Sequence, residues 1–332
     1  MKINARTTPA ALALALCLPL AACGSEDVPS AGGASDGYPL AVTNCGHEVR
    51  LEKAPERIVT IKSTSTELAL ALGLGDKVVG QAFPDGPVWH EWAEEAAEIP
   101  VLGEKAPSQE VVLETEPDLV FAGWESNLAA DTAGERDVLA KLGVASYVSP
   151  AACQGAGAPG KMTYELLFEQ ILEAGRVLGA PQEAEELVAA QRKELASLGR
   201  FARGTTALWW SSGVDTPFVG GAIGAPQMVM DAVGLTNVAG NVDDTWTSLG
   251  WEAIVDADPD VIVLVDADWN TAASKIKHLE SHPATARMTA VKEKRYLTVP
   301  FPAGEAGVRS VRAAADLVEA GASTHGLAQE QR

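Results

Sequence analysis

The chain has 332 residues, of which 47% are hydrophobic, and its 45 acidic and 25 basic residues give a formal net charge of −20. Such an acidic excess argues against nucleic acid as a partner, because phosphates would be repelled. The length is sufficient for two α/β lobes, each with its own hydrophobic core.

The N-terminus has the pattern of a signal peptide. Lys2 and Arg6 precede an apolar stretch that is too short to span a membrane, so residues 1–22 are predicted to be removed. The tetrapeptide ending at Cys23 resembles the bacterial lipobox, whose cysteine is lipidated and becomes the mature N-terminus. A chance cysteine after an ordinary signal peptide is the alternative. Residues 23–37 are predicted to be a flexible tether that holds a soluble protein at a membrane surface through the lipid alone.

Two cysteines remain once Cys17 is removed and Cys23 is lipidated. In an exported protein, Cys45 and Cys153 favour a disulfide. Two separate buried thiols are the alternative. Metal binding is disfavoured, because no histidine or further cysteine stands at ligand spacing from either.

The segment after the first predicted strand places polar residues at the start of a helix. Thr64 and Glu67 fit the capping box, in which a hydroxyl and a carboxylate satisfy the first free amides of a helix. The remaining amides, with a lysine beside them, favour an anionic group. The candidate ligand contacts here are Lys62, Ser63 and Thr64.

One motif occurs twice in the chain. Glu110 and Glu252, 142 positions apart, each open a predicted helix, and each is followed seven positions later by Pro-Asp and an apolar run. The runs are short and rich in β-branched residues, as is typical of buried parallel strands. The repeat indicates two lobes of similar design.

Residues 181–199 are predicted to form one long helix between the repeats. Pro181 suits the first turn, acidic residues follow it, and basic residues gather at the far end, which favours the helix dipole. At 1.5 Å per residue such a helix is roughly 25 Å long and would reach from one lobe to the other.

Strands and helices alternate along the whole mature chain. This pattern predicts an α/β protein of two Rossmann-like lobes, with parallel sheets covered by helices on both faces. The predicted lobes are residues 38–180 and 200–325, joined by the helix at 181–199.

Several aromatic residues fall where a ligand is expected. In open α/β sheets the ligand lies beyond the carboxyl ends of the strands, and stacked tryptophans suit a flat, bulky ligand. Arg309 follows the last predicted strand and is a candidate fork for a carboxylate or phosphate, with an ion pair to Glu305 as the alternative. The candidate tryptophans are Trp124, Trp210, Trp246 and Trp269.

Signals of catalysis are weak in this sequence. It has no nucleophile elbow and no Walker or dinucleotide loop. His278 and His282 stand four apart, but without further ligands they are interpreted as a surface pair. We therefore predict no catalytic residue, no metal and no cofactor. An exported enzyme and an adhesive surface protein remain alternative hypotheses to a binding protein.

The lipobox, the two lobes, the single long helix and the twin Glu…Pro-Asp motifs are similar to those of solute-binding lipoproteins of ABC importers, in the siderophore, haem and cobalamin class. The resemblance implies the class III periplasmic-binding-protein fold, small closure on ligand, and a monomer on the outer face of the cell membrane. It also implies that Glu110 and Glu252 pair with arginines of a permease dimer that its ATPase drives. Acids that only begin helices are the alternative.

Four stretches resemble one actinobacterial subgroup, which is proposed to import the phospholactyl precursor of a deazaflavin (coenzyme F-420). That cargo has a flat ring, a polyol, a phosphate and a carboxylate, so the resemblance implies tryptophan stacking, with Lys62 and Arg309 as anion anchors. Siderophore, haem or cobalamin is the alternative cargo. The stretches are 60–67, 123–127, 147–153 and 243–248.

Overall fold

The computed structural model describes residues 37–325, 327 and 329–330. The predicted signal peptide, Cys23 and the rest of the predicted tether up to residue 36 lie outside the described residues. Within the described part, no helix is both long enough and apolar enough to cross a membrane.

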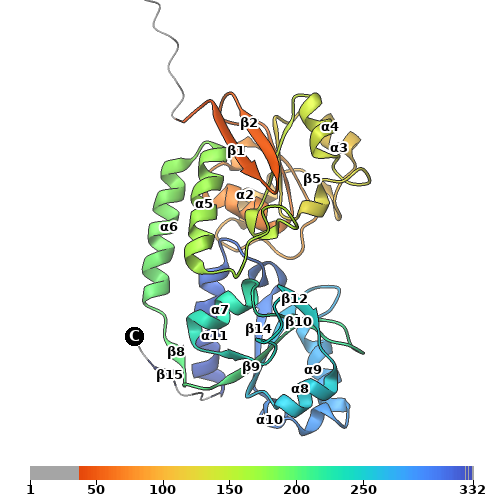
Figure 1. Ribbon diagram of the computed structural model, residues 1–332, viewed down its shortest axis with the longest axis vertical. Helices are drawn as coiled ribbons and strands as arrows, with labels where there is room; N and C mark the ends of the chain where they lie inside the picture. The colour runs from red at the N-terminus through yellow and green to blue at the C-terminus, as the bar shows by residue number, and fades with distance from the viewer. Residues whose placement is uncertain (1–36, 326, 328, 331–332) are drawn as a thin grey trace, which may run out of the picture. The chain divides into compact units, whose positions relative to one another are not determined.

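The first half of the described chain forms a five-stranded parallel sheet (Figure 1). Helices cover it, so β3 and β6 are buried along their whole length, which explains their continuous apolar sequences. In spatial order the strands are β5 (Val101–Gly103), β4 (Val78–Ala82), β3 (Ile58–Ile61), β6 (Leu119–Ala122) and β7 (Ala145–Val148). The helices of this lobe are α1 (Ser63–Ala71), α2 (Ala93–Ala97), α3 (Gln109–Glu114), α4 (Arg136–Lys141) and α5 (Tyr164–Leu178).

The second half forms a six-stranded sheet that is only partly parallel. Sequence reasoning predicted a parallel sheet, but β10 runs antiparallel to both β9 and β12. The few residues between β9 and β10 are too short for a parallel crossover, which needs a dozen or more. The strands are β12 (Trp246–Ser248), β10 (Phe218–Gly220), β9 (Thr206–Ser212), β13 (Val261–Asp266) and β14 (Tyr296–Pro300), with β11 (Thr236–Asn237) beside β9. The helices are α7 (Ala225–Val233), α8 (Trp251–Ala257), α9 (Ala272–Ser281), α10 (Thr289–Lys292) and α11 (Ser310–His325).

The Pro-Asp repeat has one structural role in both lobes. The carboxylate of Asp118 accepts hydrogen bonds from the backbone amides of Glu56 and Arg57, just before β3. The carboxylate of Asp260 accepts from the backbone amide and the hydroxyl of Thr206, at the start of β9. Each aspartate therefore fixes the neighbouring parallel strand, which explains why the motif stands directly before β6 and β13.

Helix α6 (Pro181–Ala196) joins the two halves and ends three residues before the predicted bound. It packs beside α5, as Figure 1 shows, and both helices contact the second lobe. The Gln191 amide donates to the carbonyl of Val308 at 2.7 Å, and the Tyr164 hydroxyl donates to the carbonyl of Ser310 at 2.6 Å. These bonds connect the helix pair to the start of α11. A short pair, β8 (Arg200–Phe201) and β15 (Gln329–Glu330), follows α6.

A hairpin of β1 (Leu40–Asn44) and β2 (His47–Leu51) precedes the first sheet and is held to it covalently. Cys45, in the hairpin turn, forms a disulfide with Cys153, and both residues are buried. Asn44 adds two hydrogen bonds of 2.8 Å with the backbone of Val148 at the end of β7. The disulfide ties the loop after β7 to the hairpin.

Replacing both Cys45 and Cys153 by alanine should destabilise the protein substantially. The bridge closes a loop across 108 positions, for which the chain-entropy model gives about 5 kcal/mol. Urea unfolding followed by circular dichroism measures the change. The wild type with its disulfide intact is the reference. An unchanged urea midpoint in the variant would contradict the prediction.

Candidate functional site

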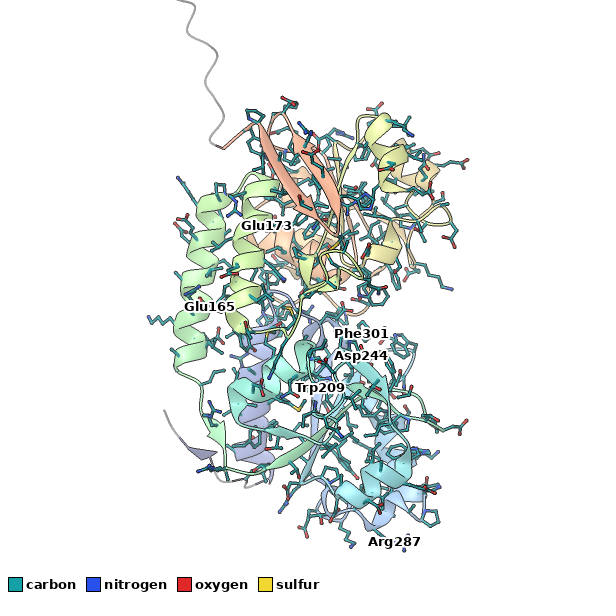
Figure 2. The ribbon with its side chains drawn as sticks, in the orientation of Figure 1. Glu165, Glu173, Trp209, Asp244, Arg287 and Phe301 are labelled. Carbon is teal, nitrogen blue, oxygen red and sulfur yellow. A yellow bond between two sulfur atoms is a disulfide. The ribbon has the colours of Figure 1, made fainter. Side chains whose placement is uncertain are left out.

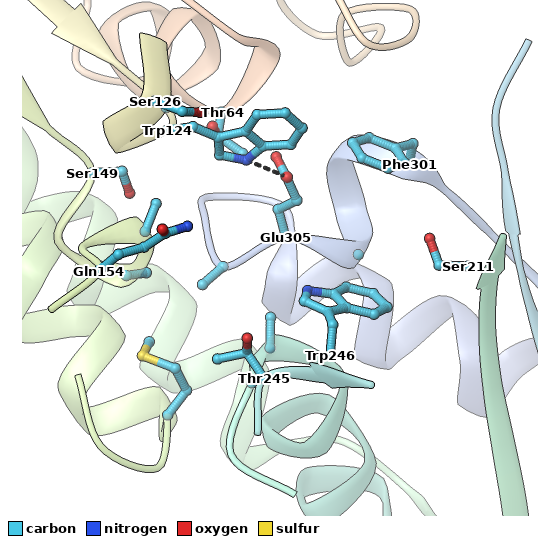
Figure 3. Close-up of a pocket in the computed structure, with 18 of the residues that line it drawn as sticks. Thr64, Trp124, Ser126, Ser149, Gln154, Ser211, Thr245, Trp246, Phe301 and Glu305 are labelled. Atoms are coloured by element: carbon cyan, nitrogen blue, oxygen red, sulfur yellow. Dashed lines mark hydrogen bonds between the residues drawn. The ribbon is translucent and has the colours of Figure 1, made fainter. Parts of the chain in front are cut away.

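A cavity of about 490 Å³ lies between the two lobes, and we call it the cleft (Figure 3). Its lining lies at the ends of strands in both sheets. It comes from the start of α1 after β3, from the segments after β6, β7, β13 and β14, from the end of β9, and from β10 and β12. The carboxyl ends of strands are the expected place for a ligand in open α/β sheets. The aromatic lining residues are Trp124, Phe218, Trp246, Trp269 and Phe301.

Trp124 forms the wall contributed by the first lobe. Its ring lies over the ammonium of Lys62, which is 3.5 Å from the ring centroid, and its indole N–H donates to Glu305 Oε1 at 2.7 Å. The close approach depends on Gly123, because a Cβ there would lie 2.6 Å from Cβ of Lys62. The contacts with Lys62 and Glu305 therefore hold the Trp124 ring in place, so that it can serve as a stacking surface for a ligand.

The second lobe supplies the opposite wall. Trp246 and Phe218 stack across the β12–β10 pair, with ring centroids 5.8 Å apart and planes 16° apart. Trp269 follows β13, meets Phe301 edge-on at 5.8 Å, and has 61% of its surface exposed. Aromatic side chains from both lobes thus face one cavity, an arrangement that suits a flat ligand.

The polar lining consists mainly of uncharged groups. Hydroxyls come from both lobes, and Glu305 contributes a carboxylate at the centre of Figure 3. Burial raises the pKa of Glu305 to about 7; the nearby ammonium of Lys62 lowers it, Asp85 raises it and the Trp124 hydrogen bond lowers it. The other polar lining residues are Thr64, Ser126, Ser149, Gln154, Ser211, Ser212 and Thr245.

Lys62 does not reach the cleft, contrary to its predicted role as an anion anchor. Its side chain is completely buried and forms an ion pair with Asp85, beneath Trp124. Ser63 is also buried, and its hydroxyl accepts a hydrogen bond from the Asp85 amide at 3.2 Å. Of the three candidates in this segment, Thr64 alone lines the cleft.

Arg309 is likewise engaged elsewhere. It is 6% exposed, forms a two-pronged ion pair with Glu67 on α1, and donates to the carbonyl of Pro87 at 2.6 Å. Its partner is therefore Glu67 and not Glu305. Burial raises the pKa of Glu67, while the hydrogen bond and charge of Arg309 lower it. The pair crosses from one lobe to the other.

The predicted capping box at Thr64 and Glu67 is wrong. Helix α1 begins at Ser63, its N-cap is Lys62, and no side chain caps it. The Glu67 carboxylate instead binds Arg309 and accepts from the Trp89 amide at 3.0 Å. The buried Arg309 therefore binds the Glu67 carboxylate that the local sequence pattern assigned to the start of the helix.

Trp210 belongs to the core and not to the cleft. It is completely buried on β9, its indole N–H donates to the carbonyl of Ser212 at 2.7 Å, and Trp251 packs edge-on against it at 5.1 Å. Its neighbour Trp209, labelled in Figure 2, is also completely buried. Because β9 is covered on both faces, consecutive residues along it are buried. Sequence position alone therefore could not distinguish these two core tryptophans from the tryptophans that line the cleft.

Among the aromatic and charged residues of the cleft lining, Phe218, Phe301 and Glu305 were not sequence candidates. Phe301 and Glu305 follow the last strand, so the strand-end rule that selected the tryptophans would have found them. Among the described residues no group of three or more histidine, cysteine, aspartate or glutamate side chains is arranged to hold a metal ion. His278 and His282 stack with ring centroids 5.9 Å apart.

The two sheets, the joining helix and the aromatic cleft define a two-lobe α/β binding protein. The periplasmic binding protein family model matches residues 58–303, and the chain belongs to that family.

Similar proteins support the same class. The chain is 26% identical to an uncharacterised ABC transporter substrate-binding lipoprotein of Bacillus subtilis, over 93% of this chain and 95% of that protein. It matches a periplasmic binding protein of Veillonella parvula with a TM-score of 0.74 and 26% identity, over 87% of this chain and 98% of that one. An Fe3+-hydroxamate transport protein of Saccharomonospora viridis matches with a TM-score of 0.70 and 26% identity, over 85% and 98%.

Proposed function

We propose that this protein is the substrate-binding lipoprotein of an ABC importer, anchored by Cys23 on the outer face of the cell membrane, and that its cleft captures a bulky small molecule with a flat ring system. The observation that carries the proposal is the cleft itself, with aromatic walls from both lobes at the strand ends. Family membership and the Bacillus subtilis relative support the transport role.

The first cargo that we propose is a deazaflavin cofactor precursor. The four stretches that resemble the deazaflavin subgroup come from separate parts of the chain, yet each contributes to the cleft. Thr64, Trp124, Ser149 and Trp246 represent the four stretches in its lining. Because all four stretches reach the same cavity, their resemblance to the subgroup supports a shared cargo.

A ferric hydroxamate is the second candidate cargo. The Saccharomonospora viridis relative, 26% identical, is described as part of an Fe3+-hydroxamate transport system. The hydroxyl-rich lining described above suits such a complex, which presents polar oxygen atoms around its metal.

Glu110 and Glu252 are the proposed contacts with the permease. Each is exposed and stands in the first turn of a helix, α3 in one lobe and α8 in the other. Neither lines the cleft. Equivalent carboxylates on the two lobes suit a permease of two equivalent subunits, to which the protein would bind as a monomer.

Replacing Trp124 by alanine should weaken cargo binding about tenfold or more. The change removes the stacking platform of the first lobe, and aromatic stacking contributes about 0.5–1.5 kcal/mol beyond the buried area. Isothermal titration calorimetry with the deazaflavin phospholactate measures the affinity. Trp92→Phe, outside the cleft, is the matched control and should bind like the wild type. An unchanged affinity in Trp124→Ala would refute the cleft as the cargo site.

A further inference from the structure

We propose that the part of the cargo that enters the cleft is uncharged or cationic, and that it offers a hydrogen-bond donor to Glu305. This inference rests on the proposed function and specifies the chemistry of its substrate. It differs from the sequence expectation of an anionic group held by Lys62 and Arg309.

Both cations that the sequence offered as anion anchors already have buried partners. Lys62 is paired with Asp85, and both side chains are at most 2% exposed. Arg309 is paired with Glu67, with side-chain exposures of 6% and 1%. Recruiting either cation for an anionic cargo would leave a buried carboxylate without its partner, which is strongly unfavourable.

The charge that remains at the cleft is a carboxylate. Among the described residues that line the cleft, Glu305 has the only charged side chain. The rest of the polar lining consists of hydroxyls and one amide. Because Lys62 and Asp85 neutralise each other, ionised Glu305 gives this region a net negative charge. The whole chain has the same sign, with a formal net charge of −20. An anion would be repelled here, whereas a donor or a cation would be attracted.

Glu305 has capacity to accept a further hydrogen bond. Its Oε1 accepts from Trp124, while Oε2 is shielded from solvent and has no hydrogen-bond partner among the described residues. An unsatisfied buried acceptor is destabilising, and a donor on the cargo would offset that cost. The terminal torsion of a glutamate is soft, so rotation of the carboxyl group can present either oxygen to the cleft.

The protonation of Glu305 adds a pH dependence. Its pKa is raised to about 7, and the groups that face it are Lys62, Asp85 and the indole of Trp124. As the pH rises through about 7, the carboxyl loses its proton and its attraction for a cation increases. Cationic cargo should therefore bind more tightly at higher pH.

A deazaflavin precursor fits these constraints in one orientation. Its ring system carries an imide N–H that can donate to Glu305 while the ring stacks on Trp124, and its polyol can reach the hydroxyls. Its phosphate and carboxylate would remain outside the cleft. Removing the phospholactate should therefore not weaken binding.

Two matched pairs of probes test the inference by calorimetry with the full-length mature protein. The first pair is the deazaflavin with and without its phospholactate. The second is a ferric trihydroxamate with a free ammonium arm and the same complex with that arm succinylated. The deazaflavin without its phospholactate should bind at least as tightly as the form that carries it. The ammonium form should bind about tenfold more tightly than the succinylated form, and this ratio should increase from about pH 6 to about pH 8, either side of the raised pKa.

Glu305→Gln should bring the ratio of the hydroxamate pair close to one and remove its pH dependence, whereas Glu293→Gln, an exposed acid of the same lobe, should change neither. Tighter binding of the anionic members would overturn the inference and leave the proposed function standing. It would direct attention to the start of α7, where Gly224 and Ala225 line the cleft. If neither pair bound, the proposed cargo classes would be wrong, and this inference with them.

Discussion

Uptake should fall to background when Glu110 and Glu252 are both replaced by alanine, while cargo affinity stays unchanged. Both carboxylates are exposed and stand away from the cleft lining, so their loss removes only the proposed pairing with permease arginines. Ion pairs across an interface set its orientation and rate of association, and two symmetric contacts are lost together. Cargo accumulation in cells measures the first quantity, and calorimetry measures the second.

The same two helices provide the control. Glu114 on α3 and Asp256 on α8 are also exposed acids, and their double replacement by alanine should leave uptake intact. The single variants Glu110→Ala and Glu252→Ala should each retain part of the uptake. Normal uptake in the Glu110→Ala, Glu252→Ala double variant would refute the docking assignment without affecting the cleft.

Replacing Arg309 by alanine should destabilise the protein by about 3–5 kcal/mol, because it leaves the buried carboxylate of Glu67 without a counter-ion. For a chain of this size such a loss lowers the melting temperature by on the order of 10 °C. Differential scanning calorimetry measures the change. The pair joins α1 of one lobe to the residue before α11 of the other, so it also limits their relative movement.

A second variant distinguishes the unpaired charge from lost packing. Glu67→Gln combined with Arg309→Met removes both charges and should be more stable than Arg309→Ala alone, because no buried charge remains unpaired. If Arg309→Ala lowered the free energy of unfolding by less than about 1 kcal/mol, the prediction would be wrong, because the pair would contribute no more than an exposed ion pair does.

The features that sequence reasoning predicted correctly are those with local signals. The buried strands β6 and β13, the repeat before them, and α6 all carry hydrophobic patterns or terminal residues that identify them within a short window. The antiparallel β10 was missed because a short connection, and not composition, determines its direction.

The errors at the candidate site concern partners that are distant in the sequence. Arg309 pairs with Glu67, 242 positions away, and no local pattern reveals that pairing. Lys62 carries a positive φ and lies beneath Trp124, where Asp85 neutralises it. Sequence alone assigned both cations to the ligand, because it could not show that the fold pairs them with buried carboxylates.

A fluorescence titration tests the central claim, capture of a ring-bearing small molecule in the cleft, most directly. The soluble protein without its signal peptide and lipid would be titrated with the deazaflavin phospholactate, a ferric hydroxamate, haem and cobalamin. Because Trp124, Trp246 and Trp269 line the cleft, bound cargo should quench their emission. The proposed function predicts saturable, submicromolar quenching by the deazaflavin or the hydroxamate. If none of the four compounds produced saturable quenching, the proposed function would be contradicted.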